Sequence, residues 1–151
     1  MYNVNEEGIN IIKTMEGFVD HPYKCSAGKW TIGYGHRLRG RVNEKMKITR
    51  DDAEDYLVED LEETEAGVIR CLNGSDTTEN QYSALVSFAF NLGVDALKKS
   101  SLLKFHNAGS YAQAHDEFSK WIYVTLPSGE KKSMKGLAIR RKMEADLYSK
   151  P

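Results

Sequence analysis

The chain has 151 residues, of which 40% are hydrophobic and 28% are charged, and its formal net charge is −1. This length and composition are typical of a globular domain with its own core, and they exclude a disordered chain. No apolar run approaches the length of a membrane span, and the first seven residues lack the basic and apolar parts of a secretory signal, so we expect neither membrane insertion nor a removable leader.

The first predicted element is a helix over about residues 5–16. Asn5 is a suitable N-cap, apolar residues follow at helical spacing, and Gly17 is typical of the position after a helix C-terminus. From about residue 18 to residue 41, β-forming residues alternate with glycines, which predicts a small antiparallel sheet or hairpin.

A long helix is predicted next, with Thr49 as its cap and an apolar stripe beside an acidic face. Its length of about 30 Å would allow it to link two lobes across a cleft. The stripe consists of Ala53, Leu57, Leu61, Val68 and Leu72.

The rest of the chain predicts helices. Residues 78–92 are apolar nearly all round, which is typical of a helix at the centre of a core. Shorter helices are predicted around residues 101–107 and 110–122, followed by a turn at Pro127-Ser128-Gly129 and a basic amphipathic helix over about residues 134–149.

Together these elements predict an α+β fold in a single domain of residues 1–151. A small sheet lobe would cover about residues 17–48, and the helix over about residues 49–72 would join it to a helical lobe. That helical lobe would comprise about residues 73–151 and the first helix.

Near the predicted sheet, one carboxyl group is well placed for catalysis. Glu16 lies in the last turn of the first helix, where the negative end of the helix dipole favours the protonated form of a carboxyl group. Such a group is suited to act as a general acid near neutral pH. The alternative is an exposed glutamate that merely ends the helix.

Further candidates follow in the predicted hairpin. Cys25 is either a small buried hydrophobic residue or a reactive thiol, and the hydroxyl of Thr31 matters if it faces a water or substrate held beside Cys25 and Glu16. Cys25 with His36 is also compatible with a Cys/His peptidase, although that leaves Glu16 without a role. His36 is otherwise a partner that orients a neighbour or a buried structural imidazole, and we slightly favour the second.

The two cysteines of the chain indicate neither a metal site nor a disulfide framework. Cys25 and Cys71 are too few for such a framework, and no Cys or His cluster has zinc-ligand spacing, so we expect no metal. A reversible disulfide between these two residues stays open, because it depends on their Cα separation.

Charge is distributed unevenly along the chain. Residues 43–66 carry 3 basic and 10 acidic side chains, whereas residues 98–151 carry 11 basic and 5 acidic side chains. Two solvated helix faces of opposite sign would explain this pattern, and the alternative is attraction of an anionic polymer. We do not expect nucleic acid, because no nucleic-acid-binding motif is present.

The order and spacing of the candidate residues resemble those of phage-type lysozymes, the T4-like endolysin family of glycoside hydrolases. Eight residues separate Glu16 from Cys25, and five separate Cys25 from Thr31. Two later segments resemble the central and C-terminal motifs of the family. The matching segments are Thr31-Ile32-Gly33-Tyr34-Gly35-His36, Phe88-Ala89-Phe90-Asn91-Leu92-Gly93 and Gly136-Leu137 followed by Arg140-Arg141 and Glu144.

The resemblance implies a muramidase that cleaves the β-1,4 bond between N-acetylmuramic acid and N-acetylglucosamine in peptidoglycan, with no cofactor. Glu16 would protonate the glycosidic oxygen, Cys25 would stand where the family most often has Asp, and Thr31 would hold the water or the sugar. We favour an inverting reaction in which Cys25 and Thr31 position water over attack by a Cys25 thiolate. Substrate-binding roles are predicted for Gly33, Tyr34, His36, Asn91 and Arg140.

Some of these residues have alternative roles. Asn91 either lines the cleft or satisfies backbone groups. Arg140 and Arg141 either attract the anionic wall or pair with Glu144 at i,i+4 and i,i+3, and we expect at least one of them to be structural. The remaining candidates for wall attraction are Lys131, Lys132 and Lys135.

The resemblance also implies a monomer that acts on peptidoglycan and causes bacterial lysis. It would stay in the host cytoplasm until a pore-forming partner releases it to the cell wall in the periplasm. The alternatives are a catalytically impaired wall-binding homologue, a Cys25/His36 amidase or peptidase, and a lytic transglycosylase.

Overall fold

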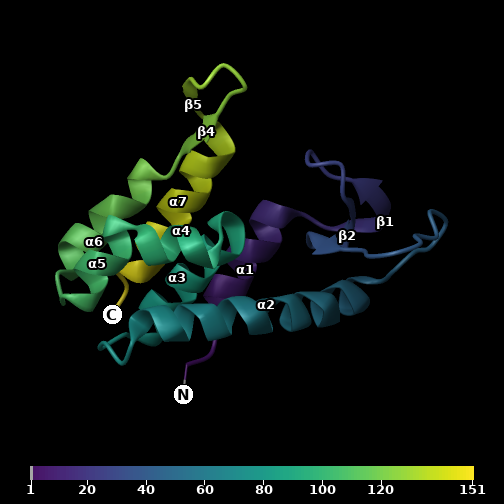
Figure 1. The fold of residues 1–151 in the computed structure, drawn as a ribbon. Helices are drawn as coiled ribbons and strands as arrows, with labels where there is room; N and C mark the ends of the chain where they lie inside the picture. The colour runs from purple at the N-terminus through teal and green to yellow at the C-terminus, as the bar shows by residue number, and fades with distance from the viewer. Residues whose placement is uncertain (1) are drawn as a thin grey trace. The chain divides into compact units, whose positions relative to one another are not determined.

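Two helices, α1 (Glu6–Glu16) and α2 (Arg50–Leu72), contribute residues to both of the units into which the chain divides. The computed structural model describes residues 2–151. The sheet unit comprises Ile12–Glu63, and the helical unit comprises the residues up to Ile11 together with Thr64–Pro151. Figure 1 shows the order of the elements along the chain.

Side-chain caps fix the predicted starts of both helices. The Asn5 Oδ1 atom accepts a hydrogen bond from the amide of Gly8 at 3.0 Å, which satisfies one of the first amides of α1. At α2, Thr49 Oγ1 accepts from the amide of Asp52 at 3.1 Å, and Asp52 Oδ2 accepts from the amide of Thr49 at 3.0 Å. The predicted cap at Thr49 is confirmed.

The sheet unit contains the predicted antiparallel sheet, in the order β1 (Val19–Lys24), β2 (Trp30–Gly33) and β3 (His36–Arg37). β2 approaches α2 closely, because a Cβ atom added to Gly33 would lie only 3.0 Å from the Cβ atom of Ala53. The predicted apolar stripe of α2 is buried, and residues of α1 and β2 join it in the core of this unit. The buried hydrophobic residues of this unit are Ile12, Ile32, Tyr34, Ala53, Leu57 and Leu61, whereas Val68 and Leu72 of the stripe belong to the helical unit.

The core of the helical unit is centred on α3 (Glu79–Leu92), as predicted. Thr78 and Gln81 form a reciprocal cap at its start, and every residue from 81 to 89 is buried. α7 (Lys135–Tyr148) packs against α3, and α5 (Ser101–Asn107) agrees with its predicted range.

Two helices of the helical unit differ from the sequence prediction. The helix expected over residues 110–122 ends early, as α6 (Tyr111–Glu117) followed by a 3-10 turn, η1 (Phe118–Lys120). A short helix, α4 (Val94–Lys99), was not predicted, because six residues are too few for an apolar period to stand out.

The predicted turn at Pro127-Ser128-Gly129 closes a small hairpin of β4 (Tyr123–Thr125) and β5 (Lys131–Ser133). These strands were missed because all their residues are exposed and they lack alternating apolar and polar residues. Within residues 2–151, no helix combines the length and apolarity that crossing a bilayer requires.

Candidate active site

Glu16 is the last residue of α1, as the sequence predicts. The helix ends there because Gly17 adopts a left-handed conformation, with φ of 74°, and its amide donates to the carbonyl oxygen of Lys13 at 2.9 Å. The Glu16 carboxyl group lies against Gly35, since a Cβ atom added to Gly35 would stand 2.8 Å from Glu16 Oε1. A glycine at position 35 therefore leaves the space that this carboxyl group occupies.

Cys25 begins the tight turn between β1 and β2. Its amide donates to the carbonyl oxygen of Lys29 at 2.9 Å, and the amide of Gly28 donates to the carbonyl oxygen of Cys25 at 2.8 Å. Gly28 has φ of 75°, which is typical of a short hairpin loop that ends with a left-handed residue. The turn thereby holds the thiol at the end of the hairpin.

Hydrogen bonds lower the pKa of the Cys25 thiol below its usual value. The largest contributions come from the backbone amides of Lys29 and Ala27, and the Thr31 hydroxyl adds a smaller one, while partial burial opposes them. The Thr31 hydroxyl also donates to the carbonyl oxygen of Lys29 at 3.0 Å. Because a hydroxyl has one proton, it can donate either to this oxygen or to the Cys25 sulfur at any moment. Thr31 is thus within hydrogen-bonding reach of the sulfur.

Tyr23 connects the candidate residues, although the sequence analysis assigned it no role in the site. It lies opposite Thr31 in the β1–β2 ladder, so both side chains point to the same face of the sheet. Burial, and then the charges of Glu16 and Cys25, raise the pKa of Tyr23. The sequence could have indicated this position of Tyr23, because it stands two residues before Cys25 and alternate residues of a strand share a face.

The other predicted residues of the sheet unit have clear structural contacts. Tyr34 is buried, and its ring packs on that of Phe18 with 5.7 Å between centroids. His36 Nδ1 lies 2.9 Å from a carboxylate oxygen of Asp60, and its ring stacks on Tyr56 at 4.3 Å. These contacts support the structural interpretation of His36, and within the described chain no hydrogen bond joins it to Cys25.

In the helical unit, Arg140 and Arg141 are buried, with 3% and 1% of their surfaces exposed. Arg140 Nε lies 3.2 Å from Glu144 Oε2, and Arg141 Nε lies 2.8 Å from Glu144 Oε1. The predicted ion pairs with Glu144 are therefore confirmed. The alternative, in which the two arginines attract the wall as surface charges, is ruled out by their burial. Arg141 Nη2 also donates to Asn91 Oδ1 at 2.7 Å.

Comparison with known proteins identifies the family of the chain. The family model described as phage lysozyme matches residues 13–144. The chain belongs to the phage lysozyme family. It is therefore an endolysin-type hydrolase of the glycosidase class.

Two endolysins align in sequence with nearly the whole length of this phage lysozyme. The endolysin of Acyrthosiphon pisum secondary endosymbiont phage 1 is 38% identical over 149 residues, which cover 97% of each chain. The endolysin of Bacillus phage B103 is 40% identical over 148 residues, which cover 97% of this chain but 54% of that relative. The chain thus spans about half the length of the second relative.

Solved structures confirm the predicted lysozyme-like α+β fold. The endolysin from Escherichia coli O157:H7 phage FAHEc1 matches with a TM-score of 0.88 and 40% identity, covering 97% of this chain and 93% of that chain. The muramidase domain of SpmX from Asticaccaulis excentricus matches with a TM-score of 0.91 and 30% identity, covering 100% of both chains.

The predicted site residues of this phage lysozyme fall into both units. Glu16, Cys25 and Thr31 all belong to the sheet unit, whereas Asn91 and Arg140 belong to the helical unit. Both cysteines are free thiols. Among residues 2–151, no group of three or more His, Cys, Asp or Glu side chains is arranged to hold a metal ion.

Proposed function

We propose that this phage lysozyme is a muramidase that hydrolyses the β-1,4 bond between N-acetylmuramic acid and N-acetylglucosamine in peptidoglycan and so causes bacterial lysis. The observation that supports this best is the arrangement of Glu16, Cys25 and Thr31 around Tyr23 in the sheet unit. It supplies a carboxyl group, a thiol whose pKa is lowered by hydrogen bonds, and a hydroxyl in a chain of a glycosidase family.

In the proposed reaction, Glu16 is the general acid. Its carboxyl proton passes to the glycosidic oxygen as the bond to the anomeric carbon breaks, which makes the sugar a neutral leaving group. The absence of a side chain at Gly35 leaves room for the carboxyl group at the end of α1. Holding a reacting group in one geometry lowers the barrier, because less orientation is left to achieve in the transition state.

Cys25 and Thr31 would act on the attacking water. The ionised thiol accepts a proton from that water while the water oxygen bonds to the anomeric carbon, and the Thr31 hydroxyl holds the water in position. The lowered pKa of Cys25 supports this role, because it increases the thiolate fraction near neutral pH. This route inverts the anomeric centre, whereas direct attack by the thiolate would retain it through a covalent intermediate.

The proposal includes binding and delivery. Gly33, Tyr34, His36, Asn91 and Arg140 would contribute to the binding of the glycan, directly or by shaping the surface that it meets. The lysozyme would act as a monomer and would pass from the host cytoplasm to the periplasmic wall through a pore made by a partner.

Mass analysis of digested peptidoglycan tests the proposal. The expected products carry a reducing N-acetylmuramic acid end with the peptide still attached, and proton NMR of fresh product gives the anomeric configuration. A 1,6-anhydro end would indicate a transglycosylase, a reducing N-acetylglucosamine end another bond, and new amino groups an amidase or peptidase. Each of these three results would contradict the proposed function.

A further inference from the structure

The β4–β5 hairpin and the residues after it combine exposed apolar side chains in one short stretch. Tyr123 and Val124 are 53% and 38% exposed, and Met134 and Ile139 are 40% and 46% exposed. These are four of the six exposed large hydrophobic residues within residues 2–151. On the strands, Val124 shares a face with its register partner Lys132, whereas Tyr123 points to the opposite face. Exposed apolar side chains that lie close together commonly mark a site of interaction.

The hairpin is anchored at its base. The amide of Met134 donates to the carbonyl oxygen of Ile122 at 2.8 Å and closes the ladder. Next to it, the ring of Trp121 packs edge-on against Phe88 of the core, with 5.4 Å between centroids. Figure 1 shows β4 and β5 projecting from the other elements of the helical unit. The exposed residues are therefore presented on a defined structure.

The outer end of the hairpin is also partly apolar. The amide of Leu126 donates to the carbonyl oxygen of Glu130, and the amide of Gly129 donates to that of Leu126, both at 2.8 Å. Pro127 is exposed in this turn and Leu126 is half-buried. Apolar groups consequently occur both on the strands and at the tip.

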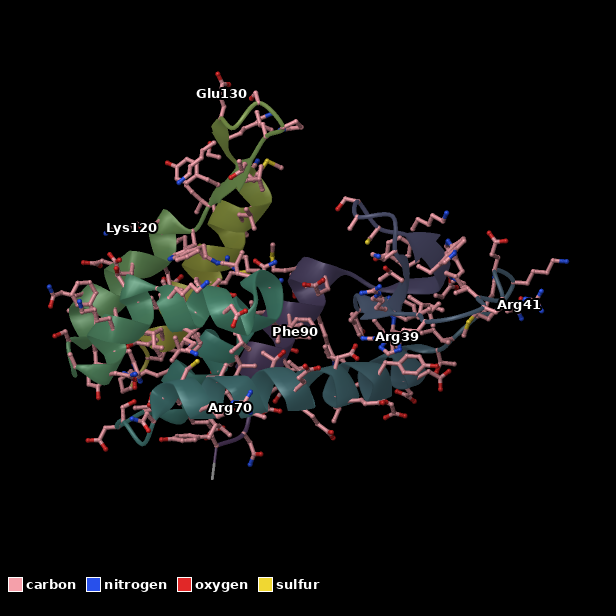
Figure 2. All side chains as sticks on the ribbon, in the orientation of Figure 1. Arg39, Arg41, Arg70, Phe90, Lys120 and Glu130 are labelled. Atoms are coloured by element: carbon pink, nitrogen blue, oxygen red, sulfur yellow. The ribbon has the colours of Figure 1, made fainter. Side chains whose placement is uncertain are left out.

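Basic residues lie directly beside these apolar groups. Lys131 and Lys132 are exposed on β5, and Lys135 is exposed at the start of α7. In the described part of the chain, none of the three forms an ion pair. The single acidic residue from Tyr123 to Ile139 is Glu130, which Figure 2 labels at the outer end of the hairpin.

The presence of both exposed apolar side chains and lysines helps to decide between two anionic partners, a wall polymer and a lipid bilayer. A wall polymer would be attracted by the three lysines and could pack its sugars on the ring of Tyr123, but the exposed aliphatic side chains of Val124, Met134 and Ile139 would gain little from it. An anionic bilayer satisfies both groups, since its phosphates attract lysines and the boundary below them accepts apolar side chains. We propose that the β4–β5 hairpin docks on the surface of an anionic phospholipid bilayer. This attachment is peripheral and independent of the proposed reaction.

Sedimentation with vesicles tests the proposal on the whole chain. The wild type should bind vesicles of phosphatidylcholine in which about a third of the lipid is phosphatidylglycerol, and should not bind phosphatidylcholine alone. Replacing Lys131 and Lys132 by Gln should weaken binding about 25-fold, at about fivefold for each lysine. The matched control replaces Lys98 and Lys99 of α4, which are equally exposed lysines outside the hairpin.

Two further substitutions test the apolar contribution and the sign of the charge effect. Val124→Thr should weaken binding about fourfold, whereas Val58→Thr, at an exposed valine of α2, should have no effect. Glu130→Gln should strengthen binding about fivefold, because it removes the only negative charge between Tyr123 and Ile139. Hydrolysis of peptidoglycan without vesicles should be unchanged in Val124→Thr and Glu130→Gln.

Several results would overturn the proposal. They are equal binding to neutral vesicles, equal losses in the Lys98/Lys99 control, or no gain with Glu130→Gln. Binding to soluble teichoic acid without binding to vesicles would instead assign the lysines to a wall polymer. Failure of hydrolysis alone would contradict the proposed function and leave lipid docking intact.

Discussion

The carboxyl group of Glu16 and the backbone of Gly35 are in direct contact, with only 2.8 Å between Glu16 Oε1 and the position that a Cβ atom on Gly35 would take. Gly35→Ala should therefore displace the carboxyl group. It also places a side chain at φ of 77°, which costs about 1–2 kcal/mol of unfolding free energy. Because small displacements of reacting groups are costly, we expect peptidoglycan hydrolysis to fall about 100-fold.

Gly40→Ala is the matched control for this prediction. Gly40 lies in the same unit and has φ of 72°, but nothing lies within 4 Å of its added Cβ atom. Urea unfolding should show similar losses of stability for both variants, while only Gly35→Ala loses activity. Equal activity in the two variants would show that the Glu16–Gly35 contact does not matter.

The two thiols should differ in the pH at which they react. Backbone amides lower the pKa of Cys25, whereas burial raises that of Cys71. As pH rises, iodoacetamide should therefore modify Cys25 before Cys71, which peptide mass spectrometry can follow at each site. Thr31→Val removes one hydrogen bond to the sulfur and should move the Cys25 profile to higher pH. Coincident profiles for the two cysteines in the wild type would contradict this account.

The buried charges of α7 should contribute far more to stability than the exposed ones. Glu144→Gln removes a fully buried carboxylate that pairs with Arg140 and Arg141, so we expect a loss of about 3–5 kcal/mol in unfolding free energy. Asp146→Asn breaks the exposed i,i+4 pair with Lys142 on the same helix and should cost at most about 1 kcal/mol. Urea unfolding of both variants measures the contrast, and similar losses would contradict it.

His106 should make stability depend on pH. Its buried ring contacts Tyr148 Oη at 2.6 Å and Thr77 Oγ1 at 2.8 Å, and burial lowers its pKa to about 4. The unfolded chain takes up this proton near pH 6.5, so the stabilisation is complete above that pH and disappears as pH falls to about 4, a change of about 3 kcal/mol.

Urea unfolding between pH 7 and pH 4 measures the His106 contribution. In His106→Gln the decline in unfolding free energy should be smaller by about 3 kcal/mol, because glutamine takes up no proton. An unchanged decline in His106→Gln would refute the assignment.

Local patterns were sufficient to predict much of this fold. Caps at Asn5 and Thr49 and the largely apolar composition of residues 78–92 are local features, and the structure confirms the elements that they predict. The β4–β5 hairpin escaped prediction because its exposed, lysine-rich strands lack a period of two.

Part of the candidate site could be predicted from local sequence, and the rest depends on tertiary packing. Cys25 and Thr31 come together through one short hairpin, which the sequence indicates. The contact of Glu16 with Gly35 joins a helix end to a later turn, and no local pattern records it. Tertiary packing also decides that Arg140 is buried rather than a surface charge, since a helix period alone does not show what covers each face.

The most direct test of the central claim is the release of reducing ends from purified peptidoglycan by Glu16→Gln. If Glu16 protonates the glycosidic oxygen, the rate should fall about 100-fold or more while the thermal midpoint of unfolding stays near that of the wild type. Glu6→Gln, at an exposed residue in the first turn of the same helix, should retain the wild-type rate. Wild-type release by Glu16→Gln would contradict the account.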